Sequence, residues 1–591
     1  MRRSLFLVLT IPVILAACAS SQSATQPADP SAEAAVHNPT TEPPASHLTA
    51  LDTTATAEAA GHTPSAGHAT ATPGAAVGPA GGITPGAETV GRFGIYELEF
   101  PWPSASYSNP WEQVQVKVAL TAPSGKATTI GGFYYAPDLW HARFSPDESG
   151  DWSWTADVSD GAQSKDFSGS FTVVETDWPG IVRSNPENNS RWILDDGTPY
   201  YPIGLGDCLL GVAGGSPLAN MGFDGEVRNA NYPEGWRTDL ETYLTAYGDS
   251  GFDLFRWSVD NCAFGLYETI DPSGNVYLQP EGLYGDQLVQ SLRQHGLRTY
   301  MVIFGFFPPF PDGSNNPAEM DAIRRYVRYV VDRYGAYVDF WELMNESPNP
   351  PITIPDDWYL QVASYLREVD PYDHPISTSW QRPDLSVIEI VSPHWYAKEN
   401  EFESDLAMLN LIEESRGHAK KPIIFGEQGN SEQNWDEGSA LRMRIRSWTA
   451  FFNEAVLIFW NTSCCKDSRG GVASNLYLGP QERGYVKVLQ DFVSGLDRGI
   501  APVQIGTSDP SRVRGYALTA QTVFVAYLHA YTDHANPTTG ISITIESPLA
   551  GTATWISPAT GAVLGTAGVS SGRQTLAAPA FTTDVALRIS P

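Results

Sequence analysis

The segment Val338-Asp-Phe-Trp-Glu-Leu-Met-Asn-Glu346 decides the fold, because this largely apolar run follows directly on the amphipathic stretch Pro317–Tyr334. A continuous apolar run predicts a strand buried on both faces of a parallel sheet, and an amphipathic stretch predicts a helix that covers such a sheet. The same alternation continues through the middle of the chain. We therefore expect eight strands, at Tyr200–Gly206, Leu254–Ser258, Arg298–Phe304, Val338–Asn345, Pro375–Trp380, Val387–Trp395, Pro422–Glu427 and Val456–Trp460.

Helical segments alternate with these strands. The clearest helix candidates are Pro317–Tyr334, Trp358–Glu368, Glu403–Ser415 and Gly438–Phe452. Strands that are joined by helical crossovers form a parallel sheet with helices on both faces. Eight such units within residues 178–499 predict a (β/α)8 TIM barrel, in which functional residues stand at the C-terminal ends of the strands.

The regions on either side of residues 178–499 have the period-two pattern of half-buried strands. Residues 92–177 contain Gln113-Val-Gln-Val-Lys-Val-Ala-Leu120, and residues 500–591 contain Thr522-Val-Phe-Val-Ala-Tyr-Leu528. Turn residues separate such runs at short intervals, which is typical of β-sandwiches. We predict an N-terminal β-sandwich over residues 92–177 and a C-terminal β-sandwich over residues 500–591, flanking the barrel.

The first 91 residues do not have the composition of a folded domain. Arg2 and Arg3 precede an apolar run that ends in Leu15-Ala-Ala-Cys18, the pattern of an export signal too short to span a bilayer. This ending resembles the lipobox of bacterial lipoproteins, which implies a signal peptide over residues 1–18, acylation of Cys18 and a protein that is exported and lipid-anchored to the bacterial cell membrane or cell surface. An ordinary signal with an incidental Cys is the alternative. Residues 19–91 contain no aromatic residue, Lys or Arg, and this composition predicts a disordered tether.

Charge limits the partners that the chain can bind. The 591 residues include 36 Lys and Arg against 67 Asp and Glu, for a formal net charge of −31. Nucleic acids and anionic membrane surfaces are bound through basic patches. We therefore expect no nucleic acid partner, and we expect membrane contact only through the N-terminal lipid.

Two glutamates stand at predicted strand ends. Glu346 closes the fourth strand and Glu427, in Phe425-Gly-Glu427, closes the seventh, so both face the mouth of the predicted barrel. Paired carboxylates about 5–5.5 Å apart are what retaining glycoside hydrolysis requires. We predict that Glu346 is the acid/base and Glu427 the nucleophile. Near neutral pH Glu346 must then hold a proton, and the nearby charge of Glu427 is expected to raise its pKa.

At these positions the chain resembles the large clan of (β/α)8 retaining glycosidases that carries its acid/base after an Asn on strand 4 and its nucleophile on strand 7. The resemblance covers roughly residues 195–495. It implies that Asn345 holds the sugar 2-hydroxyl and that the substrate is a carbohydrate. It also assigns the roles of acid/base to Glu346 and nucleophile to Glu427.

The resemblance extends to further substrate-binding residues. Arg256 in Phe255-Arg-Trp257 matches the strand 2 Arg that orients the nucleophile. His394-Trp-Tyr396 matches the strand 6 aromatic element, whose Tyr hydrogen-bonds the nucleophile. Trp460 matches the strand 8 Trp that forms the floor of the sugar site. An isolated Asn-Glu pair is a weak signal, whereas five elements in the right strand order are a specific one.

The wider arrangement is similar to known bacterial proteins as well. Trp140–Trp154 with Gly169–Val173 resembles the N-terminal sandwich domain of many bacterial glycoside hydrolases, where its aromatic residues serve packing or sugar binding. Asp195-Asp-Gly-Thr-Pro-Tyr-Tyr-Pro-Ile-Gly204 at the barrel entry resembles endoglucanase-like (cellulase-like) and apiosidase-like proteins. These resemblances do not identify the sugar.

Several alternatives stay open at this point. Glu342 points to the same side as Glu346 by the period-two rule, so it is the rival for the acid/base or else a buried partner of Arg256. Arg256 also fits a structural ion pair, and His394 fits a packed residue. The whole chain fits a non-catalytic surface glycan-binding lipoprotein or a metal-assisted hydrolase. No His-x-His or HExxH cluster occurs, so we expect no metal and no cofactor.

The remaining cysteines follow neighbouring strands of the predicted barrel. Cys208 follows strand 1, Cys262 follows strand 2, and Cys464-Cys465 follows strand 8. Thiols of an exported protein oxidise, and adjacent residues are too close for an ordinary disulfide. We predict two bridges, in which Cys464 and Cys465 each take one partner from Cys208 and Cys262. A four-thiolate metal site and unrelated free thiols are the alternatives.

Overall fold

The structure, a computed structural model, describes residues 85–207, 240–259, 264–346, 354–379, 382–397, 400–429, 438–460 and 478–591, together with the backbone of 221–222 and 237–238. Cys18, Cys208, Cys262, Cys464 and Cys465 lie outside these residues, so the lipidation and disulfide predictions stay predictions. Within the described ranges, no helix combines the length and the apolar character that crossing a membrane requires.

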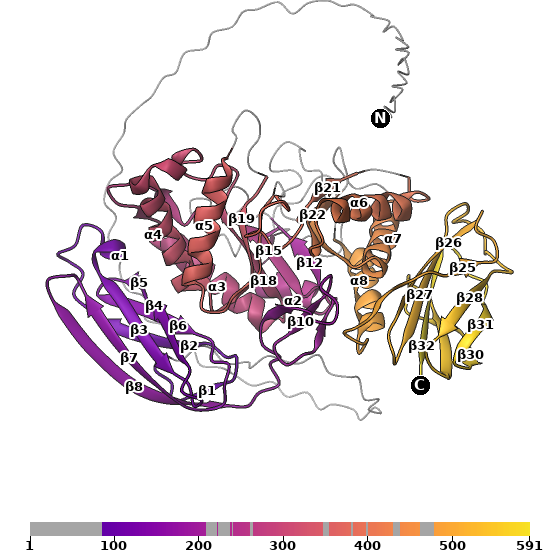
Figure 1. Cartoon of the computed structure of the whole chain (residues 1–591), viewed down its shortest axis with the longest axis horizontal. Helices are drawn as coiled ribbons and strands as arrows, with labels where there is room; N and C mark the ends of the chain where they lie inside the picture. The colour runs from indigo at the N-terminus through magenta and orange to yellow at the C-terminus, as the bar shows by residue number, and fades with distance from the viewer. Residues whose placement is uncertain are drawn as a thin grey trace, which may run out of the picture. The chain divides into compact units, whose positions relative to one another are not determined.

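Eight parallel strands form a curled central sheet in the order β20-β19-β18-β15-β12-β23-β22-β21 (Figure 1). The strands are β12 Ile203–Gly206, β15 Leu254–Ser258, β18 Arg298–Phe304, β19 Val338–Met344, β20 Ile376–Ser377, β21 His394–Tyr396, β22 Ile423–Gly429 and β23 Ala455–Trp460. The prediction of a sheet of parallel strands with helices between them is confirmed. Within the described part of the chain, β20 and β21 are the two ends of the sheet, and closure into a complete barrel stays a prediction.

The fifth and sixth strands are shorter than predicted. β20 contains only Ile376 and Ser377, and β21 begins at His394 instead of Val387. In the sixth segment Val391 makes an isolated bridge to Ile423, and Pro393 follows. Proline has no backbone N–H to donate to a ladder, so the regular pairing starts only after Pro393.

Helices accompany the strands of the central sheet. They are α2 Leu240–Gly248, α3 Gln279–Gln294, α4 Pro317–Tyr334, α5 Asp356–Val369, α6 Ser404–His418, α7 Ser439–Phe452 and α8 Pro480–Val493. α4 has the predicted bounds, because the Asn316 side chain accepts a hydrogen bond from the Ala318 N–H and a proline occupies the first turn. α2, α3 and α8 occupy βα units of the predicted barrel for which no helix bounds were clear from the sequence.

The residues before the central sheet form two antiparallel-rich sheets. One sheet has the order β1-β8-β7-β3-β4 and the other β2-β6-β5. Their strands are β1 Thr89–Gly91, β2 Tyr96–Pro101, β3 Gln115–Thr121, β4 Ala127–Gly131, β5 Phe133–Ala136, β6 Leu139–Phe144, β7 Gly150–Ser159 and β8 Ser164–Val174, with a short helix α1 Pro110–Gln113. They share one core that includes Trp140, Trp152 and Phe171.

The tether does not extend to Gly91 as predicted. Thr89, Val90 and Gly91 form β1, which pairs in parallel with Thr172–Val174 of β8. The Gly86 N–H also donates to the Glu97 carbonyl. The edge of β8 supplies hydrogen-bond partners that the composition of this segment does not reveal, so Thr89–Gly91 belong to the sheet.

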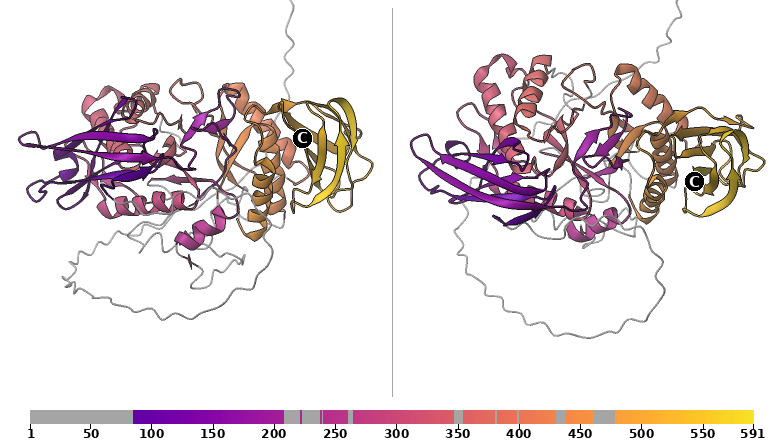
Figure 2. Two further views of the ribbon diagram at one scale, coloured as in Figure 1. Left: turned by 90° about the horizontal axis from the view of Figure 1, so that it is seen from below. Right: turned by 60° about the horizontal axis from the view of Figure 1, so that its bottom comes forward.

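The residues after the central sheet form a six-stranded sheet in the order β24-β26-β27-β32-β29-β30 and a three-stranded sheet in the order β25-β28-β31. The strands are β24 Ala501–Val503, β25 Gly506–Thr507, β26 Val513–Thr519, β27 Phe524–Ala530, β28 Ser542–Ser547, β29 Gly551–Ile556, β30 Val563–Val569, β31 Gly572–Ala577 and β32 Asp584–Ser590. Figure 2 shows these strands in yellow, and those of the N-terminal sheets in indigo, from two further directions.

Short elements complete the description. A three-stranded sheet contains β9 Val182–Ser184, β10 Trp192–Leu194 and β11 Pro199–Tyr200. Two hairpins contain β13 Met221–Gly222 with β14 Arg237–Thr238, and β16 Tyr267–Thr269 with β17 Val276–Tyr277. A 3-10 turn, η3, covers Gly313–Asn315.

An apolar cluster fills the start of the central sheet. Leu254, Tyr300, Phe340, Ile424 and Ile458 come from five different strands and pack with Trp192 and Tyr200 of the small β9–β11 sheet. Because side chains alternate along a strand, the residue two positions later points to the same side. Arg256 and Glu342 therefore continue the rows of Leu254 and Phe340 toward the C-terminal ends of the strands. Apolar side chains therefore fill the N-terminal half of the sheet, and polar side chains occupy the C-terminal ends of its strands.

A buried ion-pair cluster joins the N-terminal sheets to α3 and α4. We call it the junction network, and it consists of Glu97 on β2, Arg143 on β6, Asp286 on α3 and Arg333 on α4. Arg143 donates to Glu97 at 2.5 Å and to Asp286 at 2.6 Å. Arg333 donates to the two oxygens of Asp286 at 3.0 and 2.7 Å. These contacts tie β2 and β6 to the helices around the central sheet.

Candidate active site

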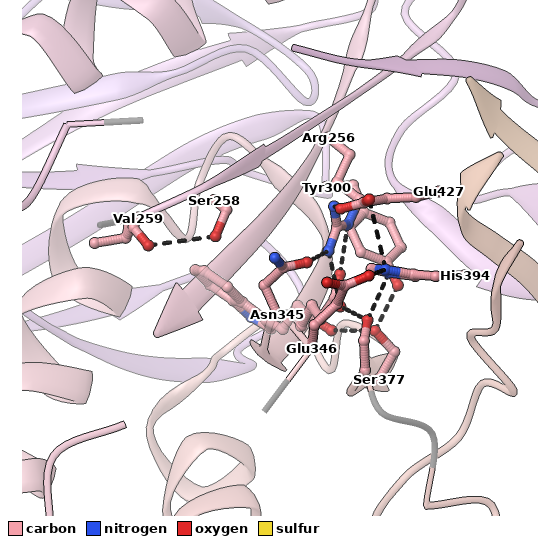
Figure 3. Close-up of polar contacts among 12 residues, drawn as sticks. Arg256, Ser258, Val259, Tyr300, Asn345, Glu346, Ser377, His394 and Glu427 are labelled. Atoms are coloured by element: carbon pink, nitrogen blue, oxygen red, sulfur yellow. Dashed lines mark hydrogen bonds and ion pairs between the residues drawn. The ribbon is translucent and has the colours of Figure 1, made fainter. Parts of the chain in front are cut away.

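Arg256 is the centre of a polar cluster at the C-terminal ends of the strands (Figure 3). Its guanidinium donates to both oxygens of Glu342, at 2.7 and 3.1 Å, and to Glu427 at 2.9 Å. It also donates to the side-chain oxygen of Asn345 at 2.6 Å. Burial alone lowers the pKa of Arg256, but the charges of Glu342 and Glu427 outweigh it and hold the pKa above its ordinary value. Arg256 therefore stays charged and connects β15, β19 and β22.

Glu427 faces this cluster because β22 contains one extra residue. In the ladder between β22 and β23, Phe425 pairs with Leu457 and Gln428 pairs with Phe459, so three steps on β22 match two on β23. Such a bulge changes which side of the sheet the following side chain faces. Ile424 lies in the apolar cluster, and Glu427, three positions later, lies on the same side. Strict alternation would place it on the other side.

Two donors hold the Glu427 carboxylate. Arg256 donates to one oxygen at 2.9 Å, and the Tyr396 O–H donates to the other. Burial and the charge of Glu427 raise the pKa of Tyr396, so the phenol keeps its proton. A hydrogen bond from a cation to a carboxylate is stronger than one between neutral groups. The two donors therefore fix the orientation of the Glu427 side chain between β15 and β21.

Glu346 stands immediately beyond β19 in an unusual backbone conformation. Its φ angle is +47°, in the left-handed region that costs a non-glycine residue about 1–2 kcal/mol. Glu346 Oε1 lies 2.8 Å from His394 Nδ1, and the Glu346 side chain is 25% exposed whereas that of His394 is 2% exposed. Strained residues concentrate at functional sites. Glu346 is the carboxylate of this cluster that solvent, and therefore a ligand, can reach.

The two predicted catalytic carboxylates lie close together. One oxygen of Glu346, one of Glu427 and a nitrogen of His394 all lie within 4.8 Å of one another. His394 Nδ1 is 3.6 Å from Glu427 Oε2. Carboxylate and imidazole atoms at this spacing are also able to hold a divalent cation. No sequence motif for a metal site reveals this group, because its members come from the end of β19, from β21 and from β22.

The surroundings of Glu346 act on its pKa in opposite directions. Burial raises the pKa, while the hydrogen bond with His394 and the positive charges of His394 and Arg256 lower it, and the balance leaves it below the ordinary value. The expectation of a raised pKa from the charge of Glu427 is therefore wrong for this arrangement. The hydrogen bond with His394 is the largest of the lowering causes, so the direction of that bond bears on whether Glu346 holds a proton.

Trp460, the last residue of β23, lies beside the end of β12. It pairs with Gly206, and a Cβ atom added to Gly206 would lie 2.9 Å from the Trp460 indole ring. Gly206 therefore leaves room for the ring at the C-terminal end of the sheet. The indole is partly exposed there, which suits a flat surface against a sugar ring.

The structure places seven predicted site residues in one region, beside Glu342, which the sequence had offered as an alternative, and Ser379, which it had not. Arg256, Asn345, Glu346, His394, Tyr396, Glu427 and Trp460 all stand at the ends of neighbouring strands. Glu342 is fully buried and bound to Arg256 through both oxygens, so it has the contacts of a structural partner and not of an acid/base. Ser379 was not predicted, because a lone Ser after a strand has no recognisable pattern. It bonds both Glu342 and His394.

Sequence comparison identifies one family model. Residues 89–159 match a domain of unknown function, DUF5060, which corresponds to most of the N-terminal sheets. Its first matched residue is the first residue of β1. A comparison with curated proteins gives no significant match.

Structural comparison identifies several glycoside hydrolases. A provisionally assigned glycoside hydrolase from Bacteroides vulgatus ATCC 8482 is 18% identical, covers 85% of this chain and 100% of its own, and superimposes with a TM-score of 0.57. A protein described as a glycoside hydrolase (15% identity, 70% and 97% coverage, TM-score 0.49) and a family 5 glycoside hydrolase from the same B. vulgatus strain (14% identity, 70% and 93% coverage, TM-score 0.48) are more distant. At such identities the first likeness shows the fold.

Proposed function

We propose that the protein is a retaining glycoside hydrolase that cleaves O-glycosidic bonds of a poly- or oligosaccharide. The observation that carries this proposal is that an oxygen of Glu346 and an oxygen of Glu427 lie within 4.8 Å of each other. Retaining enzymes hold their carboxyl groups about 5–5.5 Å apart, whereas inverting enzymes need about 6.5–9.5 Å to admit a water molecule. This spacing supports the retaining arrangement over the inverting one.

The reaction proceeds by two displacements. In the first, Glu346 gives its proton to the glycosidic oxygen while a Glu427 oxygen attacks the anomeric carbon, so the bond to the leaving group breaks as the glycosyl–enzyme bond forms. In the second, Glu346 takes a proton from water, and the water oxygen attacks the anomeric carbon and releases Glu427. Each displacement inverts the anomeric carbon, so the product keeps the configuration of the substrate.

The surrounding residues prepare the site for this chemistry. Arg256 and Tyr396 each donate to one oxygen of Glu427 and so orient the nucleophile. Asn345 uses its side-chain oxygen to accept from Arg256, which leaves its amide N–H groups to donate to the sugar 2-hydroxyl. Trp460 supplies the floor on which the sugar ring packs.

The architecture and location extend the proposal. The eight parallel strands close into a (β/α)8 barrel between two β-sandwiches, and the predicted tether, which precedes the described residues, connects them to a lipid on Cys18. The exported enzyme then acts on carbohydrate at the bacterial surface. Replacement of Cys18 by Ala should move the protein from the membrane fraction to the soluble fraction, and unchanged fractionation would contradict the lipid anchor.

The test of the activity is a screen of the purified protein on aryl glycosides and on plant and bacterial polysaccharides. We expect turnover of at least one substrate, with a first-formed product of unchanged anomeric configuration by NMR. A product of inverted configuration would contradict the two-displacement reaction. Binding of a polysaccharide without any turnover would instead support a non-catalytic surface glycan-binding lipoprotein.

A metal-assisted hydrolase is the second candidate, because Glu346, His394 and Glu427 present ligand atoms within 4.8 Å of one another. A cation there would compete with the hydrogen bonds from Arg256 and Tyr396 to Glu427. The glycosidase proposal predicts that dialysis against a chelator leaves turnover unchanged and that added Zn²⁺ inhibits it. Loss of turnover with the chelator, restored by a metal ion, would favour the second candidate.

A further inference from the structure

A chain of three hydrogen bonds runs from a buried carboxylate to the predicted acid/base. Ser379 Oγ is bonded to Glu342 Oε1 and lies 2.9 Å from His394 Nε2. His394 Nδ1 lies 2.8 Å from Glu346 Oε1. Ser379 and Glu342 are both buried. The imidazole of His394 is therefore held between a hydroxyl on one side and a carboxyl group on the other.

The number of hydrogen atoms decides the direction of these bonds. Glu342 is bonded to Arg256 through both oxygens and, as a carboxylate, only accepts. The single hydrogen of the Ser379 hydroxyl must therefore point to Glu342. Toward His394 the hydroxyl has only lone pairs left, so the hydrogen between them belongs to His394 Nε2.

Packing keeps the imidazole in this orientation. A Cβ atom added to Gly426 would lie 2.9 Å from His394 Nε2 and 2.8 Å from the Ser392 hydroxyl, so only a glycine leaves room for the ring there. His394 pairs directly with Glu427 in the sheet ladder. A turn of the ring by 180° would break the hydrogen bonds to Ser379 and Glu346 together.

Three elements bring charged groups toward His394. Glu346 comes from the end of β19 and Glu427 from β22, with Nδ1 3.6 Å from the Glu427 carboxylate. Arg256 of β15 lies behind both Glu342 and Glu427. Tyr396, on the same strand as His394, bonds Glu427. Among the described residues, the hydrogen-bond partner of His394 Nε2 is the Ser379 hydroxyl, which is uncharged.

From these contacts we infer that Ser379, held by Glu342, is a positioning residue that fixes the tautomer of His394, with the hydrogen on Nε2 and a lone pair on Nδ1. A neutral His394 of this tautomer accepts a hydrogen bond at Nδ1 from the protonated Glu346 carboxyl group and so favours the acid form of Glu346. The opposite tautomer would donate from Nδ1 and hold Glu346 as a carboxylate, which is unable to protonate the leaving group. The consequence for catalysis rests on the proposed glycosidase function, whereas the tautomer does not.

The reaction keeps its proton balance with this tautomer. Glu346 loses its proton to the glycosidic oxygen in the first displacement and regains one from water in the second. His394 keeps its Nε2 hydrogen throughout and stays neutral, while Ser379 and Glu342 exchange nothing. Ser379 thus acts through His394 and never touches the substrate.

The direct test is ¹⁵N NMR of the full chain labelled in the histidine rings, because the two ring nitrogens of each tautomer have distinct shifts. The His394 signals are identified by their loss in His394→Gln. We expect the Nε2–H tautomer in the wild type and in Ser379→Thr, which keeps the hydroxyl. We expect the Nδ1–H tautomer or a mixture in Ser379→Ala. Ser377→Ala is the matched control. Ser377 lies two residues before Ser379, but its hydroxyl bonds Tyr300 and not His394.

The second test is the pH dependence of kcat/KM on the substrate found in the activity screen. Ser379→Ala should move the basic limb, which reports the acid of the free enzyme, to lower pH by about one unit, because Nδ1–H stabilises the Glu346 carboxylate. It should lower kcat/KM about tenfold for poor leaving groups and less for good ones. Ser379→Thr and Ser377→Ala should keep the wild-type profile.

The outcomes separate this inference from the proposed function. An Nδ1–H tautomer in the wild type, or a wild-type spectrum in Ser379→Ala, overturns the role of Ser379 whatever the protein catalyses. No turnover on any glycoside overturns the glycosidase proposal, while the NMR result still decides the tautomer. If Ser379→Ala does not fold, Ser379→Cys keeps the volume with a much weaker hydrogen-bonding group and gives the same measurement.

Discussion

Two buried clusters of this molecule are built around arginine, the junction network and the candidate active site. In the junction network Arg143 and Arg333 face Glu97 and Asp286, so two cations meet two carboxylates. In the candidate active site Arg256 alone faces Glu342 and Glu427, and Glu346 adds a third carboxylate nearby. The first cluster is balanced in charge, and the second has a surplus of carboxylates.

The ratio of cations to carboxylates affects the protonation of the acids in each cluster. Burial raises the pKa of Asp286, but Arg143 and Arg333 outweigh it and bring the pKa below the ordinary value. Asp286 therefore stays ionised and its proton is not available. In the site, by contrast, two carboxylates lie within 4.8 Å of each other and share one imidazole, so a proton there has several places to go.

The comparison teaches that burial of charge alone does not mark a functional site. Both clusters contain a fully buried arginine with short bonds to acids. What distinguishes the site is an excess of acids over cations together with one partly exposed member, Glu346. A cluster with equal numbers of cations and carboxylates keeps its acids ionised and stabilises a junction. A cluster with more carboxylates than cations is able to bind and release a proton.

Replacement of Glu427 by Ala should have the largest effect on the unbalanced cluster. The nucleophile is lost, so we expect kcat to fall by at least about 10⁴-fold, with no loss of thermal stability because one surplus buried charge is removed. Azide should restore turnover by attacking in place of Glu427 and give a glycosyl azide of inverted configuration. Kinetics with calorimetry of the same sample checks both statements. A variant that keeps wild-type turnover would contradict the assignment.

Replacement of Glu346 by Ala should have the second largest effect. Loss of general acid catalysis is expected to lower kcat by about 10²–10⁴-fold on substrates with poor leaving groups. Aryl glycosides with good leaving groups need little proton transfer, so their first displacement should be nearly unaffected. The dependence of kcat/KM on the pKa of the leaving group measures this difference. Equal loss across all leaving groups would argue for a role other than proton donor.

Replacement of Arg333 by Met should damage stability and not catalysis. It leaves the buried Asp286 with Arg143 as its remaining partner, and breaking a buried ion pair costs about 3–5 kcal/mol. Chemical denaturation should show this loss, while kcat below the unfolding temperature stays unchanged. The double variant Arg333→Met with Asp286→Leu should recover part of the stability. A loss of turnover in the folded variant would mean that the junction network acts on the site.

The smallest expected effect is on the pH dependence of stability, and it comes from a third cluster, His534, His529 and Asp405. His534 lies 3.0 Å from His529, which contacts the buried Asp405 of α6. Burial, and secondly the charge of His529, lower the pKa of His534 to about 4. The unfolded chain with a pKa of about 6.5 then binds the proton first, so stability is complete above pH 6.5 and falls as the pH drops toward 4.

The effect should be on the order of 1 kcal/mol, because His534 is half-exposed and solvent screens its surroundings. The measurement is the free energy of unfolding at pH 6.5 and at pH 4.5, for the wild type and for His534→Gln. The variant should lose less stability between the two pH values. An equal loss in both proteins would show that other groups carry the pH dependence.

Much of the central sheet was predictable because most of its strands are continuous runs of apolar residues in the sequence. Val338–Met344 and Leu254–Ser258 are buried along their whole length, and α4 has a proline and a capping Asn at its start. The short β20 and β21 were not predictable in the same way. Their apolar neighbours are buried by packing outside the ladder, and Pro393 interrupts the pairing.

The candidate site was predictable where a residue type and a strand end coincide, as at Glu346 and Glu427. The direction of Glu427 depends on the bulge in β22, and no residue pattern in Phe425-Gly-Glu427 announces a bulge. Ser379 gains its importance only from contacts with Glu342 and His394, which are far away in the sequence. Such contacts are properties of the folded chain, and composition or periodicity does not encode them in a readable form.

The extra residue in β22 has an evolutionary consequence. Removal of Gly426 would restore regular alternation with β23 and would still leave Glu427 on the side of Ile424, because the two residues would then stand two positions apart. A regular strand and a bulged strand thus both direct this carboxylate toward Arg256. A one-codon insertion or deletion at Gly426 is therefore a change that a lineage can pass through without losing the inward-facing glutamate.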